Sequence, residues 1–148
     1  MTRHLLLGAD EYVAEWVGQQ VKIADFGKCT TMGFLDQRGE ILAGVVFNNY
    51  RAPNIEATIA TISPRWCSRS ALRTIFAYPF LQLRCTRLTA ITEVMNQPAR
   101  AFLCRLGFRE EGTLRKLFPG AIDGVVYGML AEECHWITAG EPMRSVAA

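Results

Sequence analysis

The chain has 148 residues, of which 50% are hydrophobic and 20% charged, and its formal net charge is +2 at pH 7. That length suits one domain with an ordinary core, and so small a charge does not by itself indicate a nucleic-acid partner. No apolar run approaches the roughly 20 residues that span a bilayer. The five cysteines are scattered and lack C-x-x-C spacing, which favours a reducing cytoplasm over disulfides or a metal site. We expect one cytoplasmic domain over residues 1–148, with a mobile tail at 138–148.

The first half of the chain predicts a helix followed by three antiparallel strands. Asp10 is the expected N-cap of a helix that runs to about Val21, and residues 3–7 fit either a short strand or a lead-in. Apolar residues predict strands at 30–36 and 40–50, joined by a turn that contains a glycine. The third strand follows the next turn.

A strand that runs into a helix start occupies residues 54–72. Apolar and polar residues alternate from Asn54 to Ile62, and Pro64 then ends the strand because proline has no N–H to donate. A helix is expected from Arg65 to about residue 83, and Pro79 should kink or end it near Tyr78.

This junction predicts an anion-binding turn. A helix start leaves backbone N–H groups unpaired at the positive end of the helix dipole, and phosphate is their usual ligand. Arg65, Arg69 and Arg73 follow at intervals of four residues, so we expect them on one face of that helix. We therefore predict that a phosphate-bearing cofactor binds at this turn.

The second half predicts a strand, a helix and a final pair of strands. Residues 87–94 alternate like a strand and follow a strand–helix crossover, so this strand should lie parallel to residues 54–62 and beside them. Asn96 begins a helix that ends at Gly107. The remaining strands are expected at 108–118 and 124–132. Together these elements predict a single α/β (α+β) domain with a mixed sheet.

Residues 96–115, NQPARAFLCRLGFREEGTLR, carry the most specific motif in the chain. They resemble the pattern N-x-x-(A/S)-x-x-x-x-x-x-L-G-F-x-x-E-G-x-x-R of the GNAT superfamily of N-acetyltransferases, in the branch that includes the ribosomal-protein N-terminal acetyltransferases. The resemblance covers residues 40–136. It implies a GNAT fold with a mixed, mostly antiparallel sheet, whose central parallel strands splay apart to hold acetyl-CoA.

The resemblance also implies which residues hold acetyl-CoA. The pantetheine arm is expected on the exposed strand edge and the pyrophosphate on the following helix start, where the residues themselves predict an anion. The implied cofactor-binding residues are Ile59, Ala60, Thr61, Ile62, Arg65, Cys67, Ser68, Arg69, Ser70 and Asn96. Asn96 also fits an ordinary helix cap, and both roles can hold together.

The chain departs from the family at the pyrophosphate loop. The family pattern [QR]-x-x-G-x-[GA] contains small residues that let the backbone approach phosphate closely. Trp66 and Ser68 stand at those positions here. We expect a different local geometry at this loop, with Arg65, Arg69 and Arg73 supplying compensating phosphate contacts.

Two residues are candidates for proton transfer. Glu56 lies on the strand where the family often carries a general base that acts through water, although it also fits a solvated carboxylate at a strand start. The family's usual acid, a tyrosine four residues before the L-G-F glycine, is Leu103 in this chain. The departing thiolate would then take its proton from Tyr127 or from water. Tyr127 also fits plain packing in a half-buried strand.

The predicted function is transfer of an acetyl group from acetyl-CoA to a primary amine, by direct attack in a ternary complex. The acceptor is a protein N-terminus, a lysine or a small-molecule amine, and Tyr12, Trp16 and Phe26 either wall its site or pack in the core. The alternative is a GNAT-fold protein without catalysis that binds or regulates, since the loop glycines and the tyrosine are missing. A third class is a nucleic-acid-binding module, whose affinity would fall steeply with salt. The family also suggests a homodimer.

Overall fold

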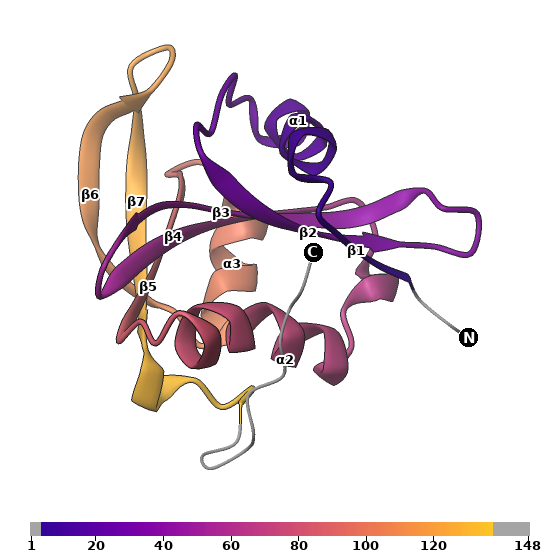
Figure 1. Cartoon of the computed structure of the whole chain (residues 1–148). Helices are drawn as coiled ribbons and strands as arrows, with labels where there is room; N and C mark the ends of the chain where they lie inside the picture. Colours follow the sequence, from indigo (N-terminus) through magenta and orange to yellow (C-terminus); the bar gives the residue numbers. More distant parts are fainter. Residues whose placement is uncertain (1–3, 138–148) are drawn as a thin grey trace.

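A computed structural model describes residues 4–137 of the chain. The strands are β1 (His4–Leu7), β2 (Cys29–Leu35), β3 (Ile41–Arg51), β4 (Asn54–Thr61), β5 (Arg87–Glu93), β6 (Arg109–Phe118) and β7 (Ile122–Leu130). The helices are α1 (Asp10–Val21), α2 (Arg69–Ala77) and α3 (Gln97–Leu106). The strands form one sheet in the order β1-β2-β3-β4-β5-β7-β6, with α1 on one face and both α2 and α3 on the other (Figure 1).

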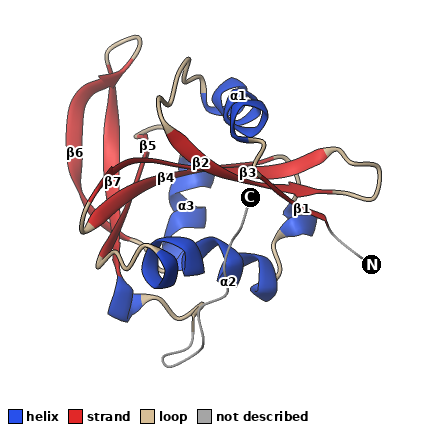
Figure 2. Ribbon diagram, viewed as in Figure 1, coloured by secondary structure: helices blue, strands red, loops and turns tan. Residues whose placement is uncertain are grey.

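The sheet is mixed and mostly antiparallel, as predicted. Strands β2, β3 and β4 form an antiparallel meander, and β5, β7 and β6 are also paired antiparallel. The pair β4–β5 is parallel, because α2 carries the chain across the sheet before β5 begins. Figure 2 shows the two layers of helices on either side of the sheet.

The main core lies between the sheet and the helices α2 and α3. Along β4, Ile55 and Ala57 are buried in this core, whereas Ala60 packs with Val13 and Val17 of α1. Side chains of a strand alternate between the two faces of a sheet. We therefore call the side of Ile55 and Ala57 the core face and the side of Ala60 the α1 face.

Helix α1 is seated closely on its face of the sheet. A Cβ atom at Gly44 of β3 would lie 2.6 Å from Val17, so only glycine permits this approach. The prediction that Asp10 caps α1 is wrong, since Ala9 is the cap residue and Asp10 is the first residue of the helix. The Asp10 carboxylate instead accepts hydrogen bonds from the backbone N–H and the hydroxyl of Thr31, both at 2.9 Å, which fastens α1 to β2.

The segment after β4 differs from the expected single helix. A 3-10 turn at Pro64–Trp66 comes first, and α2 begins only at Arg69, because the Ser68 hydroxyl caps it by accepting from the N–H of Ala71 at 3.0 Å. The helix ends at Ala77 and continues as a π-helical turn at Tyr78–Gln82, close to the predicted kink. Arg65 therefore does not lie on α2, and the expected face of three arginines is wrong.

The second half follows the prediction closely. Strand β5 is parallel to β4, and the Asn96 side chain caps α3 by accepting from the N–H of Ala99 at 3.2 Å. Gly107 ends this helix at a φ of +110°, a conformation that glycine adopts without strain. The tail expected to be mobile, 138–148, lies outside the described residues. Among residues 4–137, no helix is long and apolar enough to cross a membrane.

Candidate functional site

Strands β4 and β5 are paired at one end and part at the other. Asn54, Ile55 and Glu56 of β4 pair with residues 87–89 of β5, and the pairing stops there although both strands continue. The paired end is held by a hydrogen bond from the Thr89 hydroxyl to Oδ1 of Asn54 at 2.7 Å. Beyond Glu56, the side of β4 that faces β5 therefore has no strand partner among residues 4–137.

Two residues offer backbone groups to this opening. The N–H of Ile62 donates to the carbonyl of Leu42 on β3 at 2.9 Å. Backbone groups alternate in direction along a strand, so Ala60 also points to β3, whereas Ile59 and Thr61 point to the opening. Ile59 is half-buried and Thr61 exposed. Residues 59–62 were predicted to bind the cofactor. Of these, Ile59 and Thr61 direct their backbone groups to the unpaired edge of β4.

The turn before α2 uses some of its N–H groups internally. The N–H of Cys67 donates to the carbonyl of Pro64 at 3.0 Å, and that of Ser68 donates to the carbonyl of Trp66 at 2.9 Å. Arg69 and Ser70 are the first residues of α2, where N–H groups have no acceptor within the helix. The N–H groups available to an anion are therefore those of Arg69 and Ser70 rather than the whole run from Cys67.

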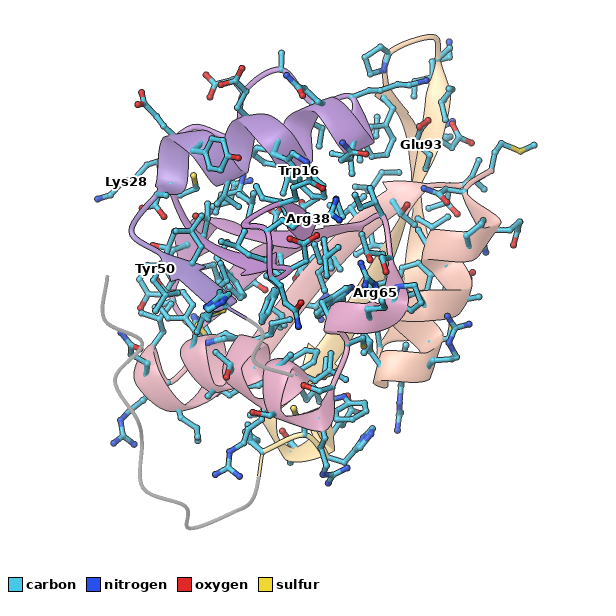
Figure 3. All side chains as sticks on the ribbon, turned by 90° about the vertical axis from the view of Figure 1, so that its right-hand side faces the viewer. Trp16, Lys28, Arg38, Tyr50, Arg65 and Glu93 are labelled. Atoms are coloured by element: carbon cyan, nitrogen blue, oxygen red, sulfur yellow. The ribbon has the colours of Figure 1, made fainter. Side chains whose placement is uncertain are left out.

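Arg65 and Arg69, two of the three arginines predicted to contact phosphate, lie in different surroundings. The Arg69 guanidinium lies 5.7 Å from the ring centre of Trp136, and the Nε1 of Trp136 donates to the carbonyl of Leu106 at 2.7 Å. Arg69 is thus held beside the start of α2. Arg65 lies on the same side of the molecule as Arg38 of the β2–β3 turn (Figure 3).

Arg65 interacts with that turn electrostatically. The N–H of Glu40 holds the pKa of the Asp36 carboxyl below its ordinary value, and the positive charge of Arg65 contributes to the same shift. The positive charge of Arg65 therefore lies close enough to the β2–β3 turn to act on its acid.

Trp66 is turned into the core. The side chain is 1% exposed, its Nε1 donates to the Thr61 hydroxyl at 2.7 Å, and its ring centre lies 5.1 Å from that of Phe34. An edge contact with Phe102, at 6.4 Å between ring centres, links this turn to α3. The loop therefore accommodates tryptophan at the family's glycine position by burying it.

Glu56 faces the other side of the sheet. Its register partners are Asn48 on β3 and Thr89 on β5, which puts all three side chains on the α1 face. The Asn48 amide donates to the carbonyl of Phe26 at 3.0 Å and so fastens the loop between α1 and β2 near this point. The Glu56 carboxylate is half-buried and has no cationic partner within residues 4–137.

Tyr127 lies on the core face, across the sheet from Glu56. Its side chain is 1% exposed, and its hydroxyl accepts from Nε of Arg100 on α3 at 3.0 Å. Arg100 also donates to the Glu110 carboxylate at 2.8 Å and to the Val94 carbonyl at 2.9 Å. The hydroxyl of Tyr127 raises the pKa of the Arg100 guanidinium above its ordinary value, with a further contribution from Glu110. Tyr127 thus belongs to a network that joins α3 to β5, β6 and β7.

A second network, on the α1 face, was missed by sequence reasoning. Arg87 pairs with the Glu111 carboxylate through both terminal nitrogens, one of them at 3.1 Å, and its Nε donates to the Thr89 hydroxyl at 2.9 Å. A Cβ atom at Gly128 would lie 2.5 Å from Oε2 of Glu111, so the glycine leaves room for this carboxylate. Glu111 stands in the quoted E-G motif, which was the only signal for it.

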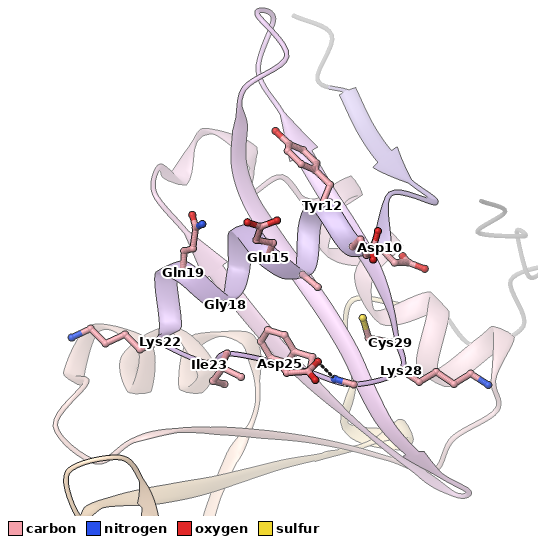
Figure 4. A pocket seen from close by; sticks show the side chains of 15 residues that line it. Asp10, Tyr12, Glu15, Gly18, Gln19, Lys22, Ile23, Asp25, Lys28 and Cys29 are labelled. Atoms are coloured by element: carbon pink, nitrogen blue, oxygen red, sulfur yellow. Dashed lines mark hydrogen bonds between the residues drawn. The ribbon is translucent and has the colours of Figure 1, made fainter.

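The residues expected to line the acceptor site do not all line the same depression in the structure. Tyr12 and Phe26 line an open depression of ≈ 1120 Å³ between α1 and the following loop (Figure 4). Trp16 is instead packed between α1 and the sheet, where its ring would lie 3.3 Å from a Cβ atom at Gly44. The depression is lined by none of the residues predicted to bind the cofactor or to transfer protons.

Comparison with known proteins identifies the fold. No protein-family model and no curated sequence matches the chain. A ribosomal-protein-S5-alanine acetyltransferase from Vibrio fischeri is 13% identical, with a TM-score of 0.67 over 93% of this chain and 97% of that one. A spermidine N-acetyltransferase from Vibrio cholerae, solved as a dodecamer, is 14% identical, with a TM-score of 0.67 over 88% and 94%. A GNAT-family acetyltransferase from Bacillus anthracis is 21% identical, with a TM-score of 0.56 over 70% and 67%. The chain therefore has the fold of the GNAT acetyltransferases.

Proposed function

We propose that the protein is an acetyl-CoA-dependent N-acetyltransferase. The observation that carries this proposal is the opening between β4 and β5, where the backbone groups of Ile59 and Thr61 have no strand partner in the described part of the chain. Pantetheine amides can pair with such an edge as a neighbouring strand would. The adjacent N–H groups of Arg69 and Ser70, at the start of the helix that also carries the Arg69 side chain, suit a diphosphate.

The other residues predicted to bind acetyl-CoA give weaker support to this proposal. Asn96 caps α3 through its side chain, so any contact with the pantetheine arm adds to that role. The N–H groups of Cys67 and Ser68 donate to carbonyls of their own turn, so they stabilise the loop and are not available to the cofactor. Arg65 lies on the side of the β2–β3 turn, and it would contribute to phosphate binding through its positive charge.

The proposed reaction is direct attack of an amine on the thioester. The amine nitrogen bonds to the acetyl carbonyl carbon, the carbon–sulfur bond breaks and the CoA thiolate leaves. A backbone N–H of Ile59 or Thr61 polarises the carbonyl, and fixed positions of both substrates supply most of the acceleration. Glu56, a half-buried carboxylate without a cationic partner in the described chain, takes the ammonium proton through water.

The proton for the thiolate comes from Tyr127 or from water. Tyr127 lies on the core face and Glu56 on the α1 face, so the acid and the base would act from opposite sides of the sheet. The Tyr127 hydroxyl is held by Arg100 and its side chain is 1% exposed. This burial favours water as the proton donor.

A binding or regulatory module without catalysis is the second candidate. One observation favours it: Trp66 stands where the family has glycine, and its contact with Phe102 joins the turn after β4 to α3. A donor lying along the β4 edge would have to fit beside this aromatic pair.

Calorimetric titration with acetyl-CoA, followed by a thiol-release assay with a panel of primary amines, tests the proposal. Saturable binding with thiol release supports the acetyltransferase. Binding without release with any amine supports the module instead. Absence of binding would overturn the assignment of acetyl-CoA itself.

A further inference from the structure

The proposed donor site has two halves, which are joined by the turn over residues 62–68. One half is the edge of β4 at Ile59 and Thr61, and the other is the start of α2 at Arg69 and Ser70. A donor that lies along the edge and places its diphosphate on the helix start contacts both halves at once. Its affinity therefore depends on how far apart the turn holds the two halves.

Trp66 lies in this turn and is hydrogen-bonded toward both halves. Its Nε1 donates to the hydroxyl of Thr61, the last residue of β4, at 2.7 Å. Its backbone carbonyl accepts from the N–H of Ser68, the cap residue of α2, at 2.9 Å. One residue thus contacts the strand edge through its side chain and the helix start through its backbone.

Further hydrogen bonds close both ends of this connection. The Thr61 hydroxyl, which accepts from Trp66, donates in turn to the carbonyl of Ser63 at 2.9 Å. At the other end, the Ser68 hydroxyl accepts from the N–H of Ala71 at 3.0 Å. The connection therefore reaches from the end of β4 into the first turn of α2 without an interruption.

The core fixes the indole ring of Trp66. The side chain is 1% exposed, and its ring centre lies 5.1 Å from that of Phe34 on β2 and 6.4 Å from that of Phe102 on α3. A buried N–H that lost its acceptor would remain desolvated and unpaired, which favours the orientation that points Nε1 at Thr61. The turn cannot shift along β4 unless this buried ring moves with it.

We propose that Trp66 is a positioning residue, whose indole N–H on the Thr61 hydroxyl sets the spacing between the β4 edge and the start of α2 that acetyl-CoA requires. This inference rests on the proposed function and adds a residue that acts through Thr61 without touching the donor. The backbone of Thr61 meets the pantetheine arm, and its side chain holds the turn. The competing role is purely structural, in which Trp66 supports the fold of each half separately.

The test separates the spacing of the halves from the quality of each half. Acetyl-CoA contacts both halves, whereas S-acetyl-pantetheine reaches only the β4 edge and 3′-phosphoadenosine 5′-diphosphate only the start of α2. Amide NMR titrations give the dissociation constants of the three ligands for the wild type and for Trp66→Phe, which keeps an aromatic ring and removes the N–H. We expect Trp66→Phe to weaken acetyl-CoA about tenfold and each fragment less than about twofold, because only the linked ligand depends on the spacing.

The possible outcomes distinguish this inference from the proposed function. Equal weakening of acetyl-CoA and of the fragments would assign Trp66 the structural role and overturn the inference. Unchanged acetyl-CoA affinity in Trp66→Phe would also overturn it, although the acetyltransferase would stand. A wild type that does not bind acetyl-CoA contradicts the proposed function, and this inference fails with it. Trp16→Phe is the matched control, because Trp16 packs between α1 and β3, and all three constants should stay unchanged.

A double-mutant cycle tests the hydrogen bond itself and needs acetyl-CoA alone. Thr61→Val keeps the shape of the side chain and removes the hydroxyl, so it should weaken acetyl-CoA about as much as Trp66→Phe does. The double variant should bind no more weakly than either single variant, since both changes remove the same hydrogen bond. Losses that multiply in the double variant would contradict the inference. Circular dichroism checks folding, and Thr61→Val decides the question if Trp66→Phe does not fold.

Discussion

The two faces of the sheet differ in how far helices cover them. The core face is covered by α2 and α3 and includes the buried side chains of Trp66 and Tyr127, each 1% exposed. Among residues 4–137, a helix covers the α1 face only over β2, β3 and β4, and Glu56 is half-buried beside the part of the sheet that no described helix covers. The comparison indicates that buried packing closes the core side, whereas the α1 side keeps half-buried and exposed side chains. The two sides meet where β4 and β5 part.

The largest expected effect concerns the α1 face. Replacing Glu56 by glutamine keeps the shape and removes the base, so kcat should fall by about 10² to 10⁴-fold with the KM for acetyl-CoA unchanged. The thiol-release assay measures this loss. Glu40→Gln, in the exposed β2–β3 turn, is the control and should retain full activity. A fall in kcat no greater than that of the control would assign Glu56 to the solvated surface.

The next effect concerns the core face. Trp66→Ala removes a buried ring from contact with Phe34 and should lower the free energy of unfolding by about 3–5 kcal/mol. Urea denaturation measures the change. Tyr12→Ala, at a side chain that is 57% exposed, should stay within about 0.5 kcal/mol of the wild type. Similar losses in the two variants would show that Trp66 does not support this face.

A smaller effect is expected where the donor would meet α2. Arg69→Ala should weaken acetyl-CoA binding about tenfold, because a charge-assisted contact to phosphate is lost. Calorimetry gives the dissociation constant, and Arg38→Ala in the β2–β3 turn is the control. Unchanged affinity in Arg69→Ala would mean that arginine does not compensate for the missing loop glycines.

The smallest effect is a pH dependence on the α1 face. Hydrogen bonds from Arg87 hold the pKa of Glu111 below its ordinary value of 4.5, with burial opposing the shift. A lowered pKa in the folded state adds stability above the ordinary value, and this stability is lost as the pH falls below it. Urea titrations at pH 6 and pH 3.5 should show a larger loss for the wild type than for Glu111→Gln. The two losses of unfolding free energy should differ by less than about 1 kcal/mol, since the pair is partly exposed. Equal losses in the two proteins would contradict this prediction.

Local patterns predicted most of the elements. The period-two alternation of β4 and β5 and the Asn96 cap depend on neighbouring residues, and the structure confirms them. The start of α2 was misplaced because the helix was expected directly after Pro64, whereas Ser63 caps only a 3-10 turn and Ser68 caps α2.

Long-range contacts set the parts of the site that the sequence did not reveal. The direction of Trp66 depends on Phe34, which lies on β2, and on Phe102 of α3. The pair of Arg87 with Glu111 forms because β7 lies between β5 and β6, and the two side chains reach each other across Gly128 of β7. Neither partner of that pair is near the other in the sequence, so no local pattern could join them.

The most direct test of the account is an acetyl-CoA titration followed by amide NMR. If the donor lies where β4 leaves β5, the backbone N–H signals of Ile59, Thr61, Arg69 and Ser70 should shift together with one dissociation constant. Amides of β1, remote from the opening, should stay in place. Saturable binding that shifts other amides and leaves these four unchanged would contradict the central claim.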